Sequence, residues 1–160
     1  MLGRRVKRSR RGGFDLRIPP EERELLRSLG PQMRVILTRP ALDEEEADPA
    51  VERLFPVAYP TDEDRQTEYR LLVQDELMES HLGALAVLEE TADADRLDEA
   101  QLTAWMRALN EVRLVLGTRL EVSEDHAGRP LDRGDPRAPA FAVYDYLTHL
   151  QGEIIEALSG

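Results

Sequence analysis

The sequence predicts a mostly α-helical protein, and three observations support this fold class. Aromatic residues make up only 5% of the chain, which favours helix packing over a β-sandwich rich in aromatic and β-branched residues. Apolar residues recur at helical spacing in several long segments. A length of 160 residues is typical of one domain with a real core. We expect an irregular bundle of four to five helices with a short N-terminal strand.

The N-terminal region divides into a basic arm and a short strand. Residues 1–13 lack the apolar content needed for packing, so we expect them to form a disordered basic arm. Residues 14–18 alternate apolar and polar side chains as a strand does, and two prolines then end the segment. Residues 14–160 are expected to form a single helical domain. The arm contains six cations: Arg4, Arg5, Lys7, Arg8, Arg10 and Arg11.

The first helix is expected to begin near Pro20, where Glu21 and Glu22 suit the positive end of the helix dipole. Helical spacing continues across Gly30-Pro31, which predicts either one kinked helix or two short helices. Residues 38–50 are acidic and flanked by prolines, as in a solvated linker. Residues 53–60 form an apolar cluster that we expect to lie extended over the core.

Three further helices are predicted. The first begins at Thr61 or Asp62 and reaches about Thr91. The second follows a pattern typical of a capping box, Asp98 with Gln101, and continues to about Leu120. Residues 123–139 form a loop, and the last helix covers about 139–158. The apolar faces of these helices, expected to point inward, include Tyr69, Leu72, Val73, Leu77, Leu85, Leu88, Trp105, Leu109, Val112, Leu116, Phe141, Tyr144, Leu147, Ile154, Ile155 and Leu158.

Charge is unevenly distributed along the chain, whose net charge is −11. Residues 1–39 hold 11 Lys/Arg against 4 Asp/Glu, so the remaining residues hold 10 against 28. An acidic body repels nucleic acid and membrane surfaces, so any phosphate contact is expected from the basic N-terminal region or from a locally basic patch. The absence of cysteine excludes disulfides and thiol switches within the chain. Without an apolar run long enough for a membrane span, we expect a cytoplasmic protein with no membrane contact.

The sequence offers no pattern typical of an enzyme. No Glu-x-x-His or His-x-x-x-His pair suits a metal site in a helix bundle, and no glycine-rich phosphate loop is present. We therefore predict no catalytic site, no metal and no cofactor. His81, His126 and His149 are isolated, as surface or helix-edge histidines are. The carboxylates Asp75, Glu76 and Glu79 are close in sequence, but such proximity arises by chance among 32 acidic residues.

The basic arm is the candidate nucleic-acid contact. If all six cations neutralised phosphates, the logarithm of the affinity would fall against the logarithm of the salt concentration with a slope of about −5. The alternative interpretation is a tail that aids solubility or an incidental chain end. No helix-turn-helix is recognisable, because the acidic connection from about Thr91 to Asp98 is longer than a three- or four-residue turn.

Polar residues interrupt the apolar face of the helix predicted after Asp98. Asn110, Arg113 and Arg119 need partners there, since an unpaired buried charge costs about 3 to 5 kcal/mol. Arg70 and Asp75 on the preceding helix are the candidate partners, which predicts an interhelical polar network that sets helix register. The alternative is a ligand or DNA site. Gly117 is expected to permit close approach of a neighbouring helix.

Four segments carry a resemblance to a known family. They are residues 53–60, Glu68-Tyr-Arg70, residues 105–120 with their Leu-Gly-Thr-Arg-Leu block, and Val143-Tyr-Asp-Tyr-Leu147 with Leu150-Gln151. Together they resemble the AosR-like family of actinobacteria, over about residues 14–158. The family is best known for an oxidative-stress transcriptional regulator, although most members have unknown function. The resemblance implies a small regulator acting at promoters, but a cysteine-based sensor is impossible in this chain.

Two hypotheses about function follow. In the first, the protein is a non-enzymatic transcriptional regulator whose arm contacts DNA while its acidic body contacts a sigma factor or an RNA polymerase subunit. In the second, it is a protein-interaction module of unknown function. That module would be homodimeric through the last helix, with Phe141, Tyr144 and Leu147 covering the partner.

Overall fold

The computed structural model describes residues 3–38, 49, 54, 63–120 and 134–160, with side chains from residue 72 onward in the long helix α3. Within these ranges the protein is mostly α, with four long helices and a short three-stranded antiparallel sheet, which confirms the predicted fold class. The elements are β1 (Val6–Arg8), β2 (Phe14–Leu16), α1 (Pro20–Thr38), α3 (Glu63–Thr91), β3 (Arg96–Leu97), α4 (Glu99–Arg119) and α5 (Ala138–Ser159).

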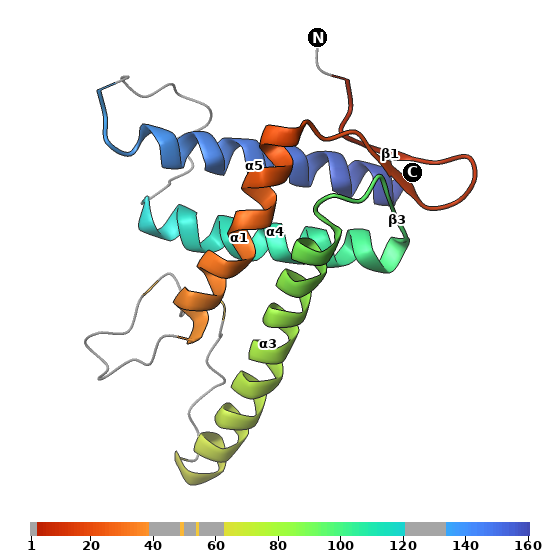
Figure 1. Cartoon of the computed structure of the whole chain (residues 1–160). Helices are drawn as coiled ribbons and strands as arrows, with labels where there is room; N and C mark the ends of the chain where they lie inside the picture. Colours follow the sequence, from red (N-terminus) through yellow and green to blue (C-terminus); the bar gives the residue numbers. More distant parts are fainter. Residues whose placement is uncertain (1–2, 39–48, 50–53, 55–62, 121–133) are drawn as a thin grey trace.

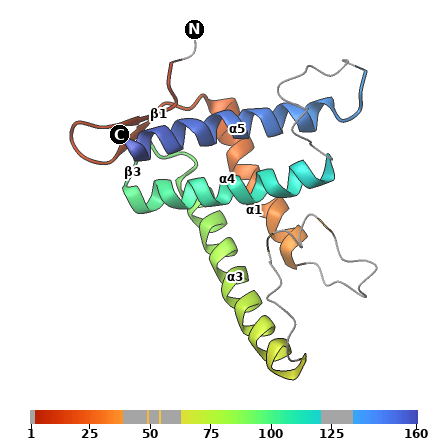
Figure 2. The ribbon, with the colours of Figure 1, turned by 180° about the vertical axis from the view of Figure 1, so that it is seen from behind.

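Helix α4 lies at the centre of the fold. It runs antiparallel beside α5, while α1 crosses on one side of this pair (Figures 1 and 2). Helix α3 packs against both α1 and α4, and its N-terminal part extends away from the body. The core between these helices includes the fully buried side chains of Leu88, Trp105, Leu109, Leu147 and Ile154. Trp105 also satisfies its indole N–H by donating to Thr91 Oγ1 at 2.6 Å.

Helix α1 is continuous and keeps Pro31 inside it, so the structure selects one helix over two short ones. Gly30 is buried against α3, where a Cβ would overlap the side chain of Glu89. Glu89 uses this space to accept hydrogen bonds from Arg34 Nη1 at 2.7 and 2.8 Å. The Gly30-Pro31 pair therefore serves the α1–α3 packing as well as the helix geometry.

The first residues form the outer strand of the sheet, which corrects the expectation of a disordered arm over residues 1–13. Val6 pairs with Leu16 and Arg8 with Phe14, and Phe14 in turn pairs with Leu97 on β3. Val6 is only 1% exposed and belongs to the core. A single valine among six cations is a weak signal for a strand in the sequence. In the structure, pairing with β2 satisfies the backbone hydrogen-bonding groups of β1, and Val6 packs against α5.

Some predicted features differ from the structure or lie outside it. Leu72 and Ile155 were expected inward but are 59% and 48% exposed, because helical spacing does not reveal which part of a face has a neighbour. Strand β3 has only two residues and was not predicted. Most of the linker 38–50, the apolar segment 53–60 and the loop 123–139 lies outside the described residues. Within the apolar segment, Leu54 is buried in the core.

The predicted start of α4 is confirmed. Asp98 is its N-cap, where Oδ1 accepts the Gln101 backbone N–H at 2.7 Å and Gln101 Oε1 accepts the Asp98 N–H at 2.9 Å. This reciprocal pair is a capping box, which satisfies two backbone donors that the helix cannot satisfy itself.

Removal of this cap is expected to destabilise the whole fold, because α4 packs against α3 and α5. Asp98→Ala should lower the free energy of unfolding by about 1 kcal/mol, measured by urea denaturation. The neighbouring Glu99→Ala is the control, since Glu99 is exposed and only contributes to the first-turn charge. An equal loss in both variants would contradict a specific role for the cap.

Candidate nucleic-acid interface

The basic N-terminal segment folds as a hairpin at the end of the molecule where α5 ends and α4 begins (Figure 1). Its tip, residues 9–13, closes through a hydrogen bond from Gly12 N–H to Ser9 O at 3.3 Å and one from Ser9 N–H to Gly13 O at 2.9 Å. Gly12 and Gly13 have φ values of +88° and +72°, which glycine adopts without steric penalty. The Gly12-Gly13 pair is therefore a turn rather than the end of an arm.

Side-chain alternation gives the sheet two different faces. The inner face carries Val6, Phe14 and Leu16, all buried against the helices. The outer face carries Lys7 and Arg17, which are exposed. Burial of the apolar face thus fixes the direction in which these two cations point.

Three of the six predicted arm cations are held by the body of the protein. Arg4 pairs with Glu156 at 2.8 Å in an exposed contact. Arg8 donates to the carbonyls of Ala157 and Leu158, at 3.2 and 3.3 Å, where a cation complements the C-terminal end of α5. Arg5 is held most firmly, with only 11% of its side chain exposed.

Arg5 links β1 to two helices. Its guanidinium binds both carboxylate oxygens of Glu22 on α1, and its backbone N–H donates to Glu153 Oε1 on α5 at 2.8 Å. The hydrogen bond to Glu22 raises the pKa of Arg5. Burial opposes ionisation of Glu22, yet the hydrogen bond from Arg5 keeps the Glu22 pKa below its ordinary value. Burial also raises the pKa of the neighbouring Tyr146 above its ordinary value.

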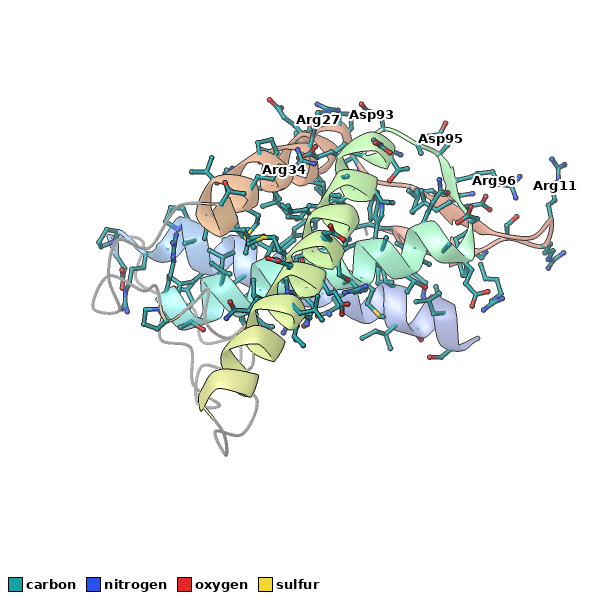
Figure 3. All side chains as sticks on the ribbon, turned by 90° about the horizontal axis from the view of Figure 1, so that it is seen from below. Arg11, Arg27, Arg34, Asp93, Asp95 and Arg96 are labelled. Carbon is teal, nitrogen blue, oxygen red and sulfur yellow. The ribbon has the colours of Figure 1, made fainter. Side chains whose placement is uncertain are left out.

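Three of the six arm cations remain, and together with Arg17 we call them the hairpin cations: Lys7, Arg10, Arg11 and Arg17. All four are exposed, and within the described residues none has a side-chain hydrogen bond or ion pair. By contrast, Arg23, Arg27 and Arg34 on α1 all pair with acidic residues, two of them labelled in Figure 3. Figure 3 also places Arg11 at the outer end of the hairpin, away from those pairs. Arg17 directly follows β2 and was missed because it lies outside the dense run of cations.

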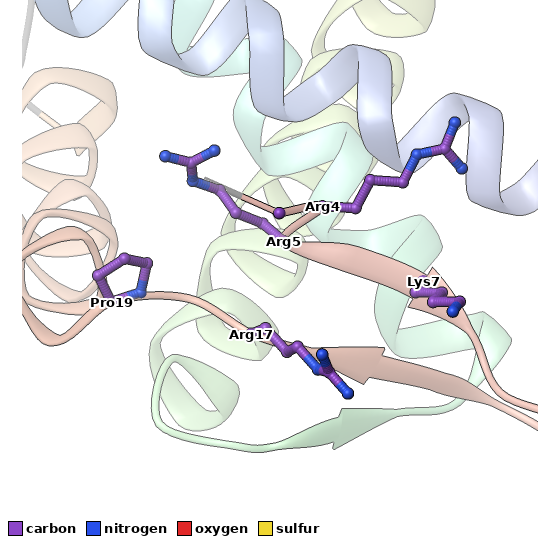
Figure 4. A pocket seen from close by; sticks show the side chains of 6 residues that line it. Arg4, Arg5, Lys7, Arg17 and Pro19 are labelled. Atoms are coloured by element: carbon purple, nitrogen blue, oxygen red, sulfur yellow. The ribbon is translucent and has the colours of Figure 1, made fainter. Parts of the chain in front are cut away.

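A hollow lies at the base of the hairpin. It has a volume of about 540 Å³ and is lined in part by Arg5, Lys7 and Arg17 (Figure 4). Arg4 and Arg5 pair with carboxylates, so Lys7 and Arg17, which flank Asp15 on the outer face, are the lining cations without an ion pair among the described residues. The hollow and the tip thus form one basic surface on an otherwise acidic chain.

Of the network residues predicted on α4, Asn110 and Arg113 meet α5 rather than α3. Arg113 donates to Thr148 Oγ1 at 2.9 Å and to Gln151 Oε1, and its guanidinium lies over the ring of Tyr144. Gln151 in turn donates to Asn110 Oδ1 at 3.5 Å. The predicted partner Asp75 is exposed on α3, so that pairing is corrected. Asp75 was preferred because it is charged, whereas neutral amide and hydroxyl oxygens also accept hydrogen bonds from a guanidinium.

The structure gives less information on the other two members of the predicted network. Arg119 is exposed near the end of α4, and the side chain of Arg70 lies outside the described residues. Gly117 faces Tyr144, whose ring carbon would lie 3.2 Å from an added Cβ. This confirms that Gly117 permits close approach of a neighbouring helix, here α5.

His81 is a buried polar residue that the sequence interpretation missed, since a surface position was expected. Its Nδ1 lies 2.5 Å from Glu111 Oε1, and its Nε2 lies 3.0 Å from the carbonyl oxygen of Leu54. The Leu54 carbonyl oxygen can only accept, so Nε2 carries a proton, and a second proton on Nδ1 makes the ring a donor to the Glu111 carboxylate as well. The hydrogen bond with Glu111 accordingly raises the pKa of His81. His149 is exposed as expected, and His126 lies outside the described residues.

Two of the three residues predicted to cover a partner on α5 are buried, whereas Tyr144 is half-buried. Phe141 and Leu147 are 7% and 0% exposed because they pack inside the domain. In the ranges that the structure describes, no group of three or more acidic or histidine side chains is arranged to hold a metal ion. No helix in those ranges has the length and apolar character required to span a membrane.

The fold and its basic surface define a class: a small helical domain that carries an ordered cationic hairpin on an acidic body. The chain belongs to the family described as a domain of unknown function (DUF2017), which matches residues 3–158.

Relatives with assigned names are found in mycobacteria, which confirms the resemblance recognised in the sequence. The putative oxidative stress regulator AosR of Mycobacterium leprae is 31% identical over 128 residues, covering 69% of this chain and 58% of the relative. The oxidative stress regulators AosR of Mycobacterium bovis and Mycobacterium tuberculosis are each 31% identical over 130 residues, covering 71% of this chain and 59% of theirs. The chain therefore spans less than two thirds of these relatives. No solved structure matches it significantly.

The contact between Arg113 and Gln151 is expected to stabilise the α4–α5 interface. Arg113→Leu should lower the free energy of unfolding by about 1 to 2 kcal/mol, because it leaves Gln151 without its charged donor. A double-mutant cycle with Gln151→Leu should give a coupling energy of at least about 0.5 kcal/mol. Arg107→Leu is the control for the cycle, since Arg107 donates instead to Ser80 on α3. Additive effects in both cycles would show that the contact contributes nothing.

The buried His81 predicts a pH-dependent stability. Because the pKa of His81 is raised on folding, its contribution is complete below the unfolded value of about 6.5 and is lost as pH rises through the folded value. His81→Gln should therefore be less stable than the wild type at pH 6, with a difference that shrinks towards pH 9. Urea denaturation across this range measures the difference, and a pH-independent difference would contradict a charged His81.

Proposed function

We propose that this protein is a non-enzymatic transcriptional regulator of the oxidative-stress type that contacts duplex DNA through its basic hairpin. The observation that carries the proposal is the segregation of charge: the four hairpin cations are exposed and have no described acidic partner on a chain of net charge −11. Three cations of α1 pair with carboxylates, so acidic side chains are available on the body. Exposed cations kept apart from those carboxylates suit an anionic partner.

The regulatory part of the proposal is supported by the relatives named oxidative stress regulator. In this chain the stress signal cannot act on a thiol, because there is no cysteine. We propose that, while the hairpin contacts DNA, the acidic body contacts a basic surface of the transcription machinery, such as a sigma factor or polymerase subunit. Charge complementarity would then favour the two contacts on different faces of the domain.

DNA binding through the hairpin predicts a defined salt dependence. If the four hairpin cations neutralise phosphates, the logarithm of the affinity should fall against the logarithm of the salt concentration with a slope of about −3.6. The combined variant Lys7→Gln/Arg10→Gln/Arg11→Gln/Arg17→Gln should lose measurable retardation of a duplex in a gel. Deletion of residues 1–13 is a poorer test, since it removes Val6 from the core.

A matched pair of single variants provides the control. Arg11→Gln should reduce the slope by about 0.9, whereas Arg4→Gln should change it little because Arg4 pairs with Glu156. Both variants remove one positive charge from the N-terminal segment. Equal effects would show that net charge, rather than the hairpin cations, governs binding, and unchanged binding by the combined variant would refute the interface.

The protein-interaction module remains the alternative. Affinity capture from the native cell, with mass spectrometry and DNA sequencing of the bound fraction, separates the two functions. Promoter DNA recovered by the wild type and lost in the combined variant supports the regulator. A protein partner recovered without DNA, and equally by both forms, supports the interaction module.

A further inference from the structure

The tip of the hairpin is a tight turn that presents two arginine side chains. Arg10 and Arg11 occupy the two central positions of the turn that begins at Ser9 and closes at Gly12. The next two positions are Gly12 and Gly13, which have no side chains. Only two guanidinium groups therefore extend from the bend itself, and Figure 1 shows that this bend lies beyond the helices.

Contacts with β3 hold the tip in place. Arg96 donates to the carbonyl oxygen of Gly12 at 2.5 Å, and its guanidinium also lies 3.5 Å from the carboxylate of Asp15. Gly13 approaches β3 so closely that an added Cβ would lie 2.9 Å from the oxygen of Leu97. The turn is thus ordered before any partner arrives, which reduces the entropy lost on binding.

The dimensions of the tip favour the minor groove of DNA over the major groove. A β-ribbon that binds in the major groove contacts the bases with the side chains of one face. Here β1 and β2 have only three residues each. Their outer face also carries the acidic Asp15, which does not suit such a contact. The minor groove is about 6 Å wide, too narrow for a helix but accessible to arginine side chains. Two arginines on a glycine-flanked turn meet this requirement.

We propose that Arg10 and Arg11 enter the minor groove of A·T-rich duplex DNA, while Lys7 and Arg17 contact the flanking phosphates. This inference rests on the proposed function and specifies its substrate. A·T-rich tracts have a narrow minor groove with enhanced negative potential, which attracts a guanidinium. In G·C-rich DNA the guanine amino group lies on the floor of the minor groove. Because this group is a hydrogen-bond donor, it cannot accept a hydrogen bond from a guanidinium.

The test compares two duplexes of equal length, one of A·T pairs and one of G·C pairs, by fluorescence anisotropy with the full chain at fixed salt. The wild type is expected to bind the A·T duplex about tenfold more tightly. Arg10→Lys/Arg11→Lys keeps the charge but replaces the guanidinium with a more strongly hydrated ammonium. This variant should lose most of the preference and keep the salt slope.

The control variant is Lys7→Gln/Arg17→Gln, which removes the proposed phosphate contacts. It should reduce the salt slope by about 1.8 and keep the A·T preference. A dye that fills the minor groove should compete with the wild type. Circular dichroism of each variant, compared with the wild type, establishes that the fold is retained.

The outcomes separate this inference from the proposed function. Equal affinity of the wild type for both duplexes, with the expected salt slope and no competition by the dye, overturns the minor-groove assignment and leaves DNA binding in place. A preference that survives Arg10→Lys/Arg11→Lys also overturns it. Absence of binding to either duplex refutes both proposals.

Discussion

The basic surface depends on one buried interaction, the contact of Arg5 with carboxylates on two helices. Arg5 joins Glu22 of α1 and Glu153 of α5 at the start of β1, so it fixes where the hairpin leaves the body. A buried guanidinium is tolerated only when it is fully paired, since removal of one partner of such a pair costs about 3 to 5 kcal/mol. The same contact neutralises Arg5 and leaves the positive charge of the hairpin to the residues beyond it.

The central helix also has polar contacts on two sides, of which only the contact towards α3 is fully buried. Towards α5, Arg113 and Asn110 are satisfied by the neutral groups of Gln151 and Thr148. Towards α3, the carboxylate of Glu111 is paired with the imidazolium of His81. Polar contacts of this kind have directional geometry, so they specify helix register in a core whose apolar side chains alone would tolerate shifts.

The division of charge has consequences for how such a domain meets its partners. An acidic body repels a polyanion, so electrostatic attraction favours approach to DNA only in orientations where the hairpin faces the DNA. Burial of the apolar inner face against the helices directs the outer face, with Lys7 and Arg17, towards solvent. Ordered presentation of a few cations, rather than a flexible tail, is therefore the physical basis of the proposed interface.

The sequence by itself determined the mostly α class, the capping box that begins α4 and the close approach at Gly117, because these depend on local periodicity and local hydrogen bonding. It also located the cationic segment. Tertiary structure decided which cations remain exposed, that Val6 makes this segment a strand, and that Arg113 meets Gln151 instead of Asp75. It likewise buried His81 against Glu111. The physical reason is that pairing and burial depend on residues distant in sequence, such as Arg5 and Glu153, and single-chain periodicity contains no information on which distant groups meet.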